Sequence, residues 1–447
     1  MCGGDGMKAK RLAGAAVSLL LTFLLCGCEL FTADTAELLR PPALSGDLAP
    51  ISDAIKESAG GAFTLKYPSA GNFRSAVIQN DIDGDGLFEA FAFYSTQGSD
   101  SSVTMHMNII CEKDGEWKSA AQQSIVAGGV DRIDFCDLDS DGIQEILVGW
   151  EIYGASKMQL GVYSFKDGRI TQCMLEEYTR FTYCDLDSDG VNEVFIINHN
   201  PTEQKNSASV YVLNDTGITE IYRCELDRTV QSVGDPVVSH LSSGRPAVYI
   251  DEVKGIGAVT EVLFVEKNSL VNPLINAETN ETLATLRPVG ITVTDINGDS
   301  VPEIPVQEKV PNIAAPDNGE RLYLTNWCSY NGETLTVQLT TMIDSDEGYY
   351  YIIPQSKTGQ IAVLKDSESG ARNIYAYNRE TLSAGARLFT LVKTEMAEYE
   401  EKKADNYSGF EEITNDGIYV YLCQISDEGA SLGISVESIR ENFRLIE

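Results

Sequence analysis

The segment Asp137-Leu-Asp-Ser-Asp-Gly-Ile-Gln-Glu145 places four carboxylates within nine residues. Carboxylates at positions 1, 3 and 5 of a tight loop point inward together, and a glycine at position 6 permits the unusual backbone angles of the turn. The backbone carbonyl of position 7 and the acid at position 9 complete a set of oxygen ligands. Hard oxygen ligands in this number are what Ca²⁺ prefers in proteins. The segment therefore predicts a calcium-binding loop.

The same pattern occurs four times, and we number the copies as loops 1 to 4. Their flanks read as strands, and position 12 of the first copy is Ala92, so the pattern does not fit an EF-hand, which needs Glu there. We expect four structural Ca²⁺ ions that stabilise the fold. The predicted ligands are Asp81, Asp83, Asp85, Leu87 and Glu89 in loop 1; Asp137, Asp139, Asp141, Ile143 and Glu145 in loop 2; Asp185, Asp187, Asp189, Val191 and Glu193 in loop 3; and Asp295, Asn297, Asp299, Val301 and Glu303 in loop 4.

The spacing of the loops indicates a structural repeat. Consecutive loops start 56, 48 and 110 residues apart, and the last interval equals two periods. A degenerate copy, Ser239-His-Leu-Ser-Ser-Gly-Arg-Pro-Ala247, fills that interval and keeps the glycine but not the carboxylates, so metal there is doubtful. Weaker echoes surround Gly359 and Gly417, and the second of these also fits a plain hairpin turn.

A period of about 50–55 residues with several short strands in each unit is typical of a β-propeller. Each unit would form a four-stranded blade with an apolar face that it buries only against its neighbours. The sequence therefore predicts an all-β protein, a β-propeller of seven four-stranded blades. The alternative is six blades with a small C-terminal α+β element.

The loops and their flanking strands resemble FG-GAP or VCBS-type repeats, which are related to the propeller of integrin α-subunits. Repeats of that family carry D-x-D-x-D-G-x-x-[DE] between the first two strands of a blade. The resemblance covers residues 63–390. It departs from the pattern at Asn297 and Ser300 of loop 4, and the FG-GAP dipeptide itself is absent. The resemblance implies a calcium-binding propeller that presents loops on one face to a partner.

The N-terminal segment resembles the signal peptide of a bacterial lipoprotein. Basic residues precede an apolar run at 15–25 that is too short to span a bilayer comfortably. The run ends in Leu25-Cys-Gly-Cys28, which resembles a lipobox. This resemblance implies cleavage of residues 1–27, lipidation of Cys28 and an extracytoplasmic position at the bacterial cell membrane.

Three further segments follow the cleavage site. Residues 28–62 are predicted to be a tether with a short helix at 48–58. Residues 63–390 hold the calcium-binding propeller repeats. Residues 391–447 are predicted to form C-terminal strands and helices that close or flank the propeller.

Composition and the scarcity of histidine narrow the function. A net charge of −34 argues against nucleic-acid partners. The three histidines, His106, His199 and His240, share no metal-ligand spacing. The segment Gly429-Ala-Ser-Leu-Gly433 matches a nucleophile elbow, but no histidine follows it as that fold requires. We therefore expect no catalytic residues and no enzymatic activity.

The function predicted from sequence is a lipid-anchored, extracytoplasmic binding or scaffold protein with structural calcium sites. Its partner would be a protein or a glycan at the cell surface, and the lipid would hold it to the membrane. The alternative is a propeller-based carbohydrate-active enzyme that uses carboxylates in the central channel.

Overall fold

The computed structural model describes residues 48–97, 103–154, 157–214, 217–308, 319–378, 380–381 and 383–446. Cys28, the signal peptide and most of the tether lie outside this part of the chain. Among the described residues, none of the helices has the length and apolar character needed to cross a membrane.

The first three sheets are antiparallel and follow the chain order from strand to strand. In sheet 1, two short strands pair with the same edge of β3, one after the other along its length. The strands of sheet 1 are β1 (Thr64–Lys66), β2 (Val77–Asn80), β3 (Glu89–Gln97), β4 (Val103–Lys113) and β5 (Glu116–Ile125); of sheet 2, β6 (Gly129–Cys136), β7 (Glu145–Glu151), β8 (Met158–Lys166) and β9 (Arg169–Tyr178); and of sheet 3, β10 (Arg180–Cys184), β11 (Glu193–Asn200), β12 (Lys205–Asn214) and β13 (Gly217–Glu225).

Sheet 4 and sheet 5 keep this plan with additions. A two-stranded ribbon, β19 (Ile275–Asn276) with β20 (Glu281–Thr282), follows sheet 4, and the C-terminal strand joins the edge of sheet 5. The strands of sheet 4 are β14 (Ser232–Val233), β15 (Val237–His240), β16 (Pro246–Lys254), β17 (Gly257–Glu266), β18 (Ser269–Val271) and β21 (Arg287–Pro288); those of sheet 5 are β22 (Ile304–Gln307), β24 (Leu324–Tyr330), β25 (Leu335–Asp344), β26 (Tyr349–Ile353) and β32 (Phe443–Leu445).

Sheet 6 forms a C-terminal lobe together with short helices. Its six strands follow the order β23-β27-β28-β29-β31-β30. They are β23 (Gly319–Leu322), β27 (Ile361–Asp366), β28 (Arg372–Asn378), β29 (Ser383–Glu395), β30 (Glu411–Asn415) and β31 (Tyr419–Ile425); the helices of this part are η2 (Gln355–Lys357), α4 (Met396–Lys402), α5 (Asp427–Ser431) and α6 (Val436–Asn442).

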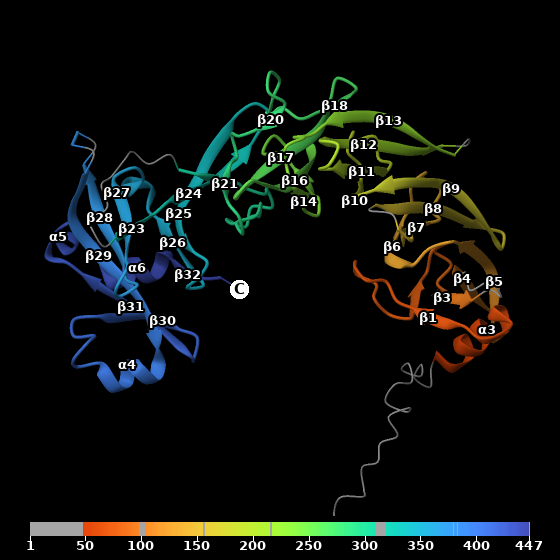
Figure 1. Ribbon diagram of the computed structural model, residues 1–447, viewed down its shortest axis with the longest axis horizontal. Coiled ribbons are helices and arrows are strands. Elements are labelled where there is room, and N and C mark those ends of the chain that lie inside the picture. Colours follow the sequence, from red (N-terminus) through yellow and green to blue (C-terminus); the bar gives the residue numbers. More distant parts are fainter. Residues whose placement is uncertain are drawn as a thin grey trace, which may run out of the picture.

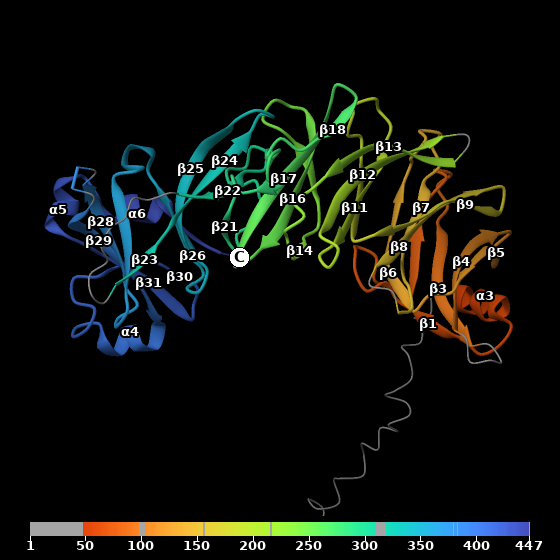
Figure 2. The same cartoon turned by 45° about the horizontal axis from the view of Figure 1, so that its top comes forward.

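The six sheets succeed one another along an arc, from sheet 1 at one end to the C-terminal lobe at the other (Figures 1 and 2). The prediction of an all-β protein built from consecutive antiparallel blades is confirmed. The number of seven blades is not confirmed, because the described strands form six sheets of four to six strands and one ribbon. The weak echo around Gly417 is a hairpin turn between β30 and β31.

Hydrophobic clusters lie between successive sheets and explain the stacking. Because side chains alternate across a strand, Phe91 and Phe93 of β3 face sheet 2, where Ile146 and Trp150 meet them at 0% exposure. Sheets 2 and 3, 3 and 4, and 4 and 5 are joined by clusters of the same kind. Each of sheets 2, 3 and 4 therefore buries its two apolar faces against two neighbouring sheets, as repeat architectures require.

Helix α3 (Ala49–Ala59) covers the outer face of sheet 1. Its buried Ile51 and Ile55 pack on Ala90, Ala92 and other side chains of the face opposite to sheet 2. The helix lies where the sequence predicts one, with Pro50 at its start, a position that proline tolerates. It shields from water an apolar face that would otherwise need another sheet.

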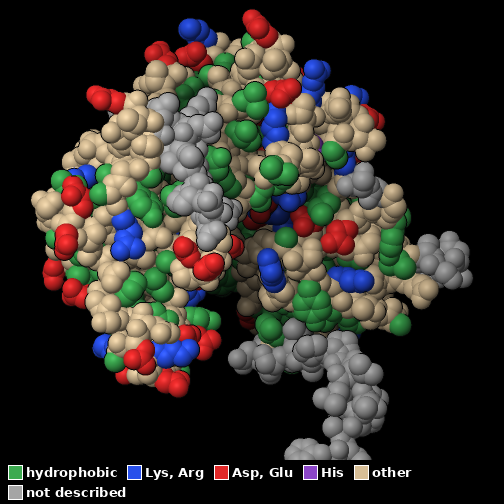
Figure 3. Space-filling view, turned by 60° about the vertical axis from the view of Figure 1, so that its left-hand side comes forward, with side chains coloured by type: hydrophobic (Ala, Val, Ile, Leu, Met, Phe, Trp, Pro, Cys, Tyr) green, Lys and Arg blue, Asp and Glu red, His purple; other side chains and the backbone are tan. Residues whose placement is uncertain are grey.

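Over the face shown in Figure 3, acidic, basic and hydrophobic side chains are interspersed. The strongly negative net charge is thus not gathered into one acidic patch in this view. Part of the acidic residues of the chain belongs to the four loops described below.

The Gly429→Ala substitution should lower the free energy of unfolding. A Cβ atom on Gly429, buried in α5, would clash with the backbone oxygen of Leu388 in β29. We expect a loss of about 1–3 kcal/mol, the usual range for overpacking, measured by denaturant unfolding. Gly61→Ala is the control, since its Cβ meets no atom within 4 Å. Equal stability of the two variants would contradict the packing of α5 on β29.

Candidate calcium-binding loops

Each of loops 1 to 3 connects a strand at the edge of its sheet to the strand that pairs with it. Loop 1 joins β2 to β3, loop 2 joins β6 to β7, and loop 3 joins β10 to β11. Loop 4 precedes β22, and a bridge between Thr294 and Glu303 closes its base. The loops therefore occupy equivalent places in sheets 1, 2, 3 and 5, and the degenerate copy occupies that place in sheet 4.

The glutamate at position 9 holds the start of its own loop. In all four copies one carboxylate oxygen accepts a hydrogen bond from the backbone N–H of position 2, at 2.8–3.1 Å. In loop 2 the other oxygen of Glu145, Oε1, is buried without a hydrogen-bond partner. A buried, unpartnered carboxylate oxygen facing two aspartates is suited to a cation, because leaving it unpaired is costly.

The aspartates at positions 1 and 5 also accept hydrogen bonds from the backbone, and the position 1 aspartate does so on both of its oxygens. The N–H of position 6 donates to the position 1 aspartate at 2.8–3.0 Å in every loop. The N–H of position 7 donates to the position 5 aspartate at 2.7–2.9 Å. The backbone thus fixes the direction of each carboxylate. The position 7 residues that donate these bonds are Leu87, Ile143, Val191 and Val301. That their carbonyl oxygens bind calcium stays a prediction.

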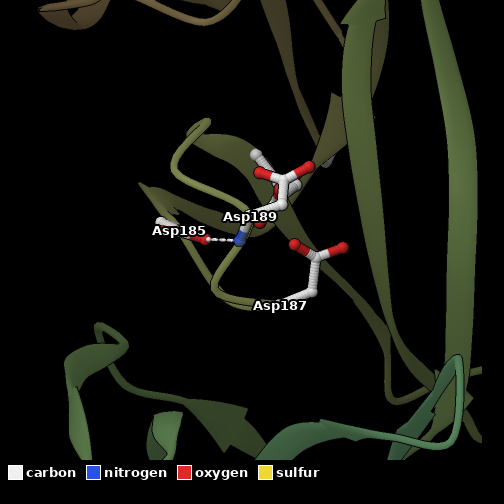
Figure 4. A group of neighbouring side chains, drawn as sticks. Asp185, Asp187 and Asp189 are labelled. Atoms are coloured by element: carbon white, nitrogen blue, oxygen red, sulfur yellow. Dashed lines mark hydrogen bonds between the residues drawn. The ribbon is translucent and has the colours of Figure 1, made fainter.

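Loop 3 brings its carboxylates together most completely. Asp185, Asp187, Asp189 and Glu193 each place one oxygen within 4.8 Å of the others. Figure 4 shows the three aspartates around the turn, with the N–H of Asp189 bonded to Asp185. Loop 1 gathers its three aspartates in the same way, and loop 2 gathers its residues at positions 1, 3 and 9.

A lysine competes for the carboxylates of loop 2. Lys166, at the end of β8, forms an ion pair with Asp141 and lies 3.8 Å from Asp139. The Lys166 ammonium sits where it offsets part of the negative charge of the loop. The sequence pattern gave no sign of this contact, because Lys166 lies 25 residues after Asp141.

Loop 4 departs from the others at the residues that differ in sequence. The side-chain nitrogen of Asn297 donates to Asp299 at 3.1 Å and to Glu303 at 2.8 Å. The amide nitrogen therefore occupies the side of the loop where an aspartate would offer an oxygen. Ser300 stands at position 6 with φ of 71°, a left-handed conformation that glycine adopts at lower cost.

Loops of neighbouring sheets contact one another. The N–H of Gln144 in loop 2 donates to the carbonyl of Ile82 in loop 1 at 2.7 Å. Asn192 of loop 3 donates to the carbonyl of Asp137 in loop 2 at 3.4 Å. Ser239 of the degenerate copy donates to the carbonyl of Ser300 in loop 4 at 3.3 Å. The order of each loop is therefore coupled to the contact between sheets.

Burial changes the acidity of the position 9 glutamates. Desolvation, opposed by the backbone hydrogen bond and reinforced by nearby aspartates, raises the pKa of Glu145 and of Glu193 to about 7. The pKa of Glu303 is raised to about 7 for the same reasons, and that of Glu89 is raised as well. Cation binding must therefore compete with protons near neutral pH.

A cleft of about 780 Å³ lies beside loops 1 and 2. Asp83 of loop 1 and Ile143 of loop 2 contribute to it, together with Lys113, Lys118 and Lys166 from the strand ends of sheets 1 and 2. Cationic side chains on its wall suit an anionic ligand. The sequence did not suggest this cleft, because two different sheets line it and Lys166 lies far along the chain from Lys113 and Lys118.

The chain matches no family model and no curated protein. Among solved structures, it is similar to a rhamnogalacturonan lyase of Bacillus licheniformis, with 13% identity over 70% of this chain and 74% of that chain and a TM-score of 0.31. An exotype rhamnogalacturonan lyase shows 10% identity, 81% and 90% coverage and a TM-score of 0.29. An exo-β-1,3-galactanase of Phanerochaete chrysosporium shows 10% identity, 74% and 80% coverage and a TM-score of 0.26.

The chain is thus similar, at low identity, to β-propeller-like proteins that act on sugars. The prediction that it has no enzymatic activity is contradicted, since the similar structures are lyases, a lactonase and galactanases. We predicted no activity from the missing histidine pattern, which bears on one kind of active site only. These similarities are too low to assign a reaction to this chain, and the resemblance to FG-GAP or VCBS repeats stays a prediction.

Calcium should stabilise the protein more than magnesium, which sheds its water reluctantly. At a hundredfold excess over the dissociation constant, one site should add about 2.7 kcal/mol to the free energy of unfolding. The Asp185→Ala variant should lose this part of the response, measured as the difference in thermal unfolding between calcium and chelator. Ser239→Ala, in the degenerate copy, should keep it. An unchanged response in Asp185→Ala would rule out loop 3 as a calcium site.

The stabilisation by calcium should be larger at pH 8 than at pH 5.5. Without metal, a glutamate whose pKa rises from 4.5 to about 7 on folding takes up a proton between these values. Its contribution to the metal-free fold is therefore present at low pH and is lost as the pH rises through 7. Calcium needs the ionised form, so its effect grows over the same window. Unfolding scans with calcium and with chelator at both pH values measure the difference, and a response that shrinks with rising pH would contradict it.

Proposed function

We propose that this chain is a calcium-stabilised protein that binds a glycan or a protein at the cell surface. A lipid on Cys28 would anchor it to the extracytoplasmic face of a bacterial membrane. The observation that carries the proposal is the convergence of Asp185, Asp187, Asp189 and Glu193 on one point. Such a group of carboxylates repels itself unless a cation or protons neutralise it. Groups of this kind in loops 1, 2 and 3 favour Ca²⁺, which would be abundant at the proposed extracytoplasmic position.

The role proposed for the ions is to hold successive sheets together. Loop 2 bonds to loop 1 through the backbone N–H of Gln144, and its Asp137 carbonyl accepts a hydrogen bond from the side chain of Asn192 in loop 3. A cation that fixes one loop therefore also fixes the groups that its neighbour contacts. Binding energy of the ions becomes stability of the stack by linkage.

A second candidate function is a carbohydrate-active enzyme, and the cleft beside loop 1 favours it. Lys113 and Lys118 line this cleft with Asp83, which is itself a predicted calcium ligand. Lysine ammonium groups and a bound cation would both attract the carboxylates of an acidic polysaccharide. The cleft, rather than a central channel, is the place where we would expect such a substrate.

A single assay on a glycan panel tests both candidates. The panel includes rhamnogalacturonan and β-1,3-galactan, and both retention of the glycan and release of products are measured with calcium present. We expect an acidic glycan to be retained, and the Lys113→Ala/Lys118→Ala variant to bind it about tenfold more weakly, since each charged contact contributes on the order of 1 kcal/mol.

The control is Lys205→Ala, which removes a lysine of sheet 3 that pairs with Glu203 away from the cleft. Product release that is lost in the double variant would establish the enzyme. Retention without products would support the binding protein. If the chain neither retains nor cleaves any acidic glycan, the cleft is excluded as a glycan site.

The proposed lipid anchor has its own test. The Cys28→Ala variant should move from the detergent phase to the aqueous phase in phase partitioning, because it lacks the lipid. Unchanged partitioning would exclude lipidation at Cys28.

A further inference from the structure

A second group of oxygen-bearing side chains is buried between sheets 3 and 4. Asn206 on β12, Glu252 on β16, Glu261 on β17 and Asn272 just after β18 are each at most 6% exposed. Because side chains alternate along a strand, Glu252 shares its face with Val248 and Ile250, which belong to the hydrophobic cluster joining these sheets.

Glu261 and Asn206 lie on the same inward faces. Glu261 stands between Val259 and Leu263 of that cluster, and Asn206 follows the alternation of Ala208 and Val210. Three polar residues thus occupy core-facing positions where the strand pattern calls for apolar ones. Polar groups at such positions cost free energy unless they are fully paired.

The contacts join these residues into one group. Glu261 accepts hydrogen bonds from the N–H of Asp227 at 3.2 Å, from Asn272 Nδ2 at 2.8 Å and from Thr282 Oγ1 at 2.8 Å. Asn206 Nδ2 donates to Glu252 Oε1 at 2.8 Å. The carboxyl groups of Glu252 and Glu261 are within hydrogen-bonding reach of each other.

Three oxygen atoms of this group have no hydrogen-bond partner although they are buried. They are Glu252 Oε2, Asn206 Oδ1 and Asn272 Oδ1. The cationic side chain of this region, Lys254, pairs with Asp227 and Glu281 instead, at 2.6 and 2.9 Å. The structure thus presents two carboxylates and two amide oxygens with no recorded ion pair to either glutamate among the described residues.

Two species could neutralise the pair of glutamates. A shared proton would satisfy Glu252 Oε2 and remove one charge, and burial together with the neighbouring carboxylate does raise the pKa of Glu252. A proton leaves the oxygens of Asn206 and Asn272 without a partner. A divalent cation neutralises both carboxylates and accepts both amide oxygens as ligands, so it accounts for every unpartnered oxygen of the group.

We propose that Glu252, Glu261, Asn206 and Asn272 form a buried site for a hard divalent cation such as Ca²⁺, separate from the acidic loops, which ties sheet 3 to sheet 4. All its donor atoms are oxygens, the set that Ca²⁺ selects. The degenerate copy at 239–247 meets the N-terminal end of β16, whereas Glu252 of the proposed site lies near the C-terminal end of that strand. Sheet 4 is therefore the sheet whose acidic loop is lost and whose inward face carries this group instead.

The burial of the site gives the test, because a fully enclosed ion exchanges slowly whereas the exposed loops lose theirs to a chelator. The full chain, purified in detergent, is incubated with calcium, treated with EGTA and desalted, and its metal content is measured by elemental analysis. We expect about one equivalent to remain bound to the folded protein and to be released on unfolding in guanidinium. Asp185→Ala should lower the total before chelation but leave the retained equivalent unchanged.

The Glu252→Gln variant separates the cation from the proton. A cation site loses its retained equivalent and the variant unfolds at a lower temperature than the wild type in calcium. A proton-sharing pair is imitated by the amide, so the variant would unfold at the same or a higher temperature, and this result would overturn the proposal. Glu281→Gln, which removes one of the two carboxylate partners of Lys254, is the control that should retain the equivalent.

Diffraction from the wild-type chain keeps the test decisive should Glu252→Gln fail to fold. Crystals grown with Tb³⁺ in place of Ca²⁺ should show an anomalous peak about 2.3–2.6 Å from oxygens of Glu252 and Glu261. Peaks at the acidic loops without one between sheets 3 and 4 would overturn the inference while leaving the proposed function of the loops intact.

Discussion

The structure depends on directing several carboxylates at one point of a short turn. In every loop, the backbone N–H groups of positions 2, 6 and 7 bind one oxygen of the acids at positions 9, 1 and 5. These bonds orient the carboxylates before any ion arrives. At positions 5 and 9 they occupy one of the two oxygens, whereas the position 1 aspartate accepts backbone bonds on both. The turn also needs left-handed backbone at positions 4 and 6, which Ser140 and Gly142 provide in loop 2. Charge and backbone conformation are therefore parts of one constraint.

The consequence for the whole molecule runs through the contacts between loops. Each loop stands at the edge of its sheet, where it meets the next loop, as Gln144 meets Ile82. The hydrophobic clusters between sheets supply most of the driving force for stacking, while the loops fix how one sheet is set against the next. Helix α3 covers the free face of sheet 1 at one end of the arc, and sheet 6 with its helices stands at the other (Figure 1).

In this acidic chain, individual lysine and arginine side chains offset the charge of particular carboxylates close to them. Lys166 offsets the charge of loop 2 and Lys254 that of Asp227. Arg372 in the C-terminal lobe is paired with Asp344 and Glu347 in the same manner. At Glu252 and Glu261, where no such ion pair is recorded among the described residues, a bound cation is the proposed counter-charge.

The sequence by itself determined the local chemistry: the four loops, their strand flanks and the all-β class. This was possible because the acids at positions 1 to 9 contact the backbone of their own loop, so that spacing along the chain sets the geometry. Even the weaker fit of loop 4 could be read from Asn297 and Ser300. The helix at 48–58 was also predictable, because its signals, a proline at the start and the spacing of its apolar residues, lie close together in the sequence.

Only the tertiary structure decided the contacts between distant segments. Lys166 lies against Asp141 and Asn206 meets Glu252 across 25 and 46 positions of the chain, and the cleft is lined by residues of two different sheets. The number of sheets also followed from pairing that no local pattern encodes, since β32 joins β26 and β31 joins β29. Loop chemistry is set by neighbours in sequence, whereas the charge balance and packing between sheets depend on where the chain brings those sheets together.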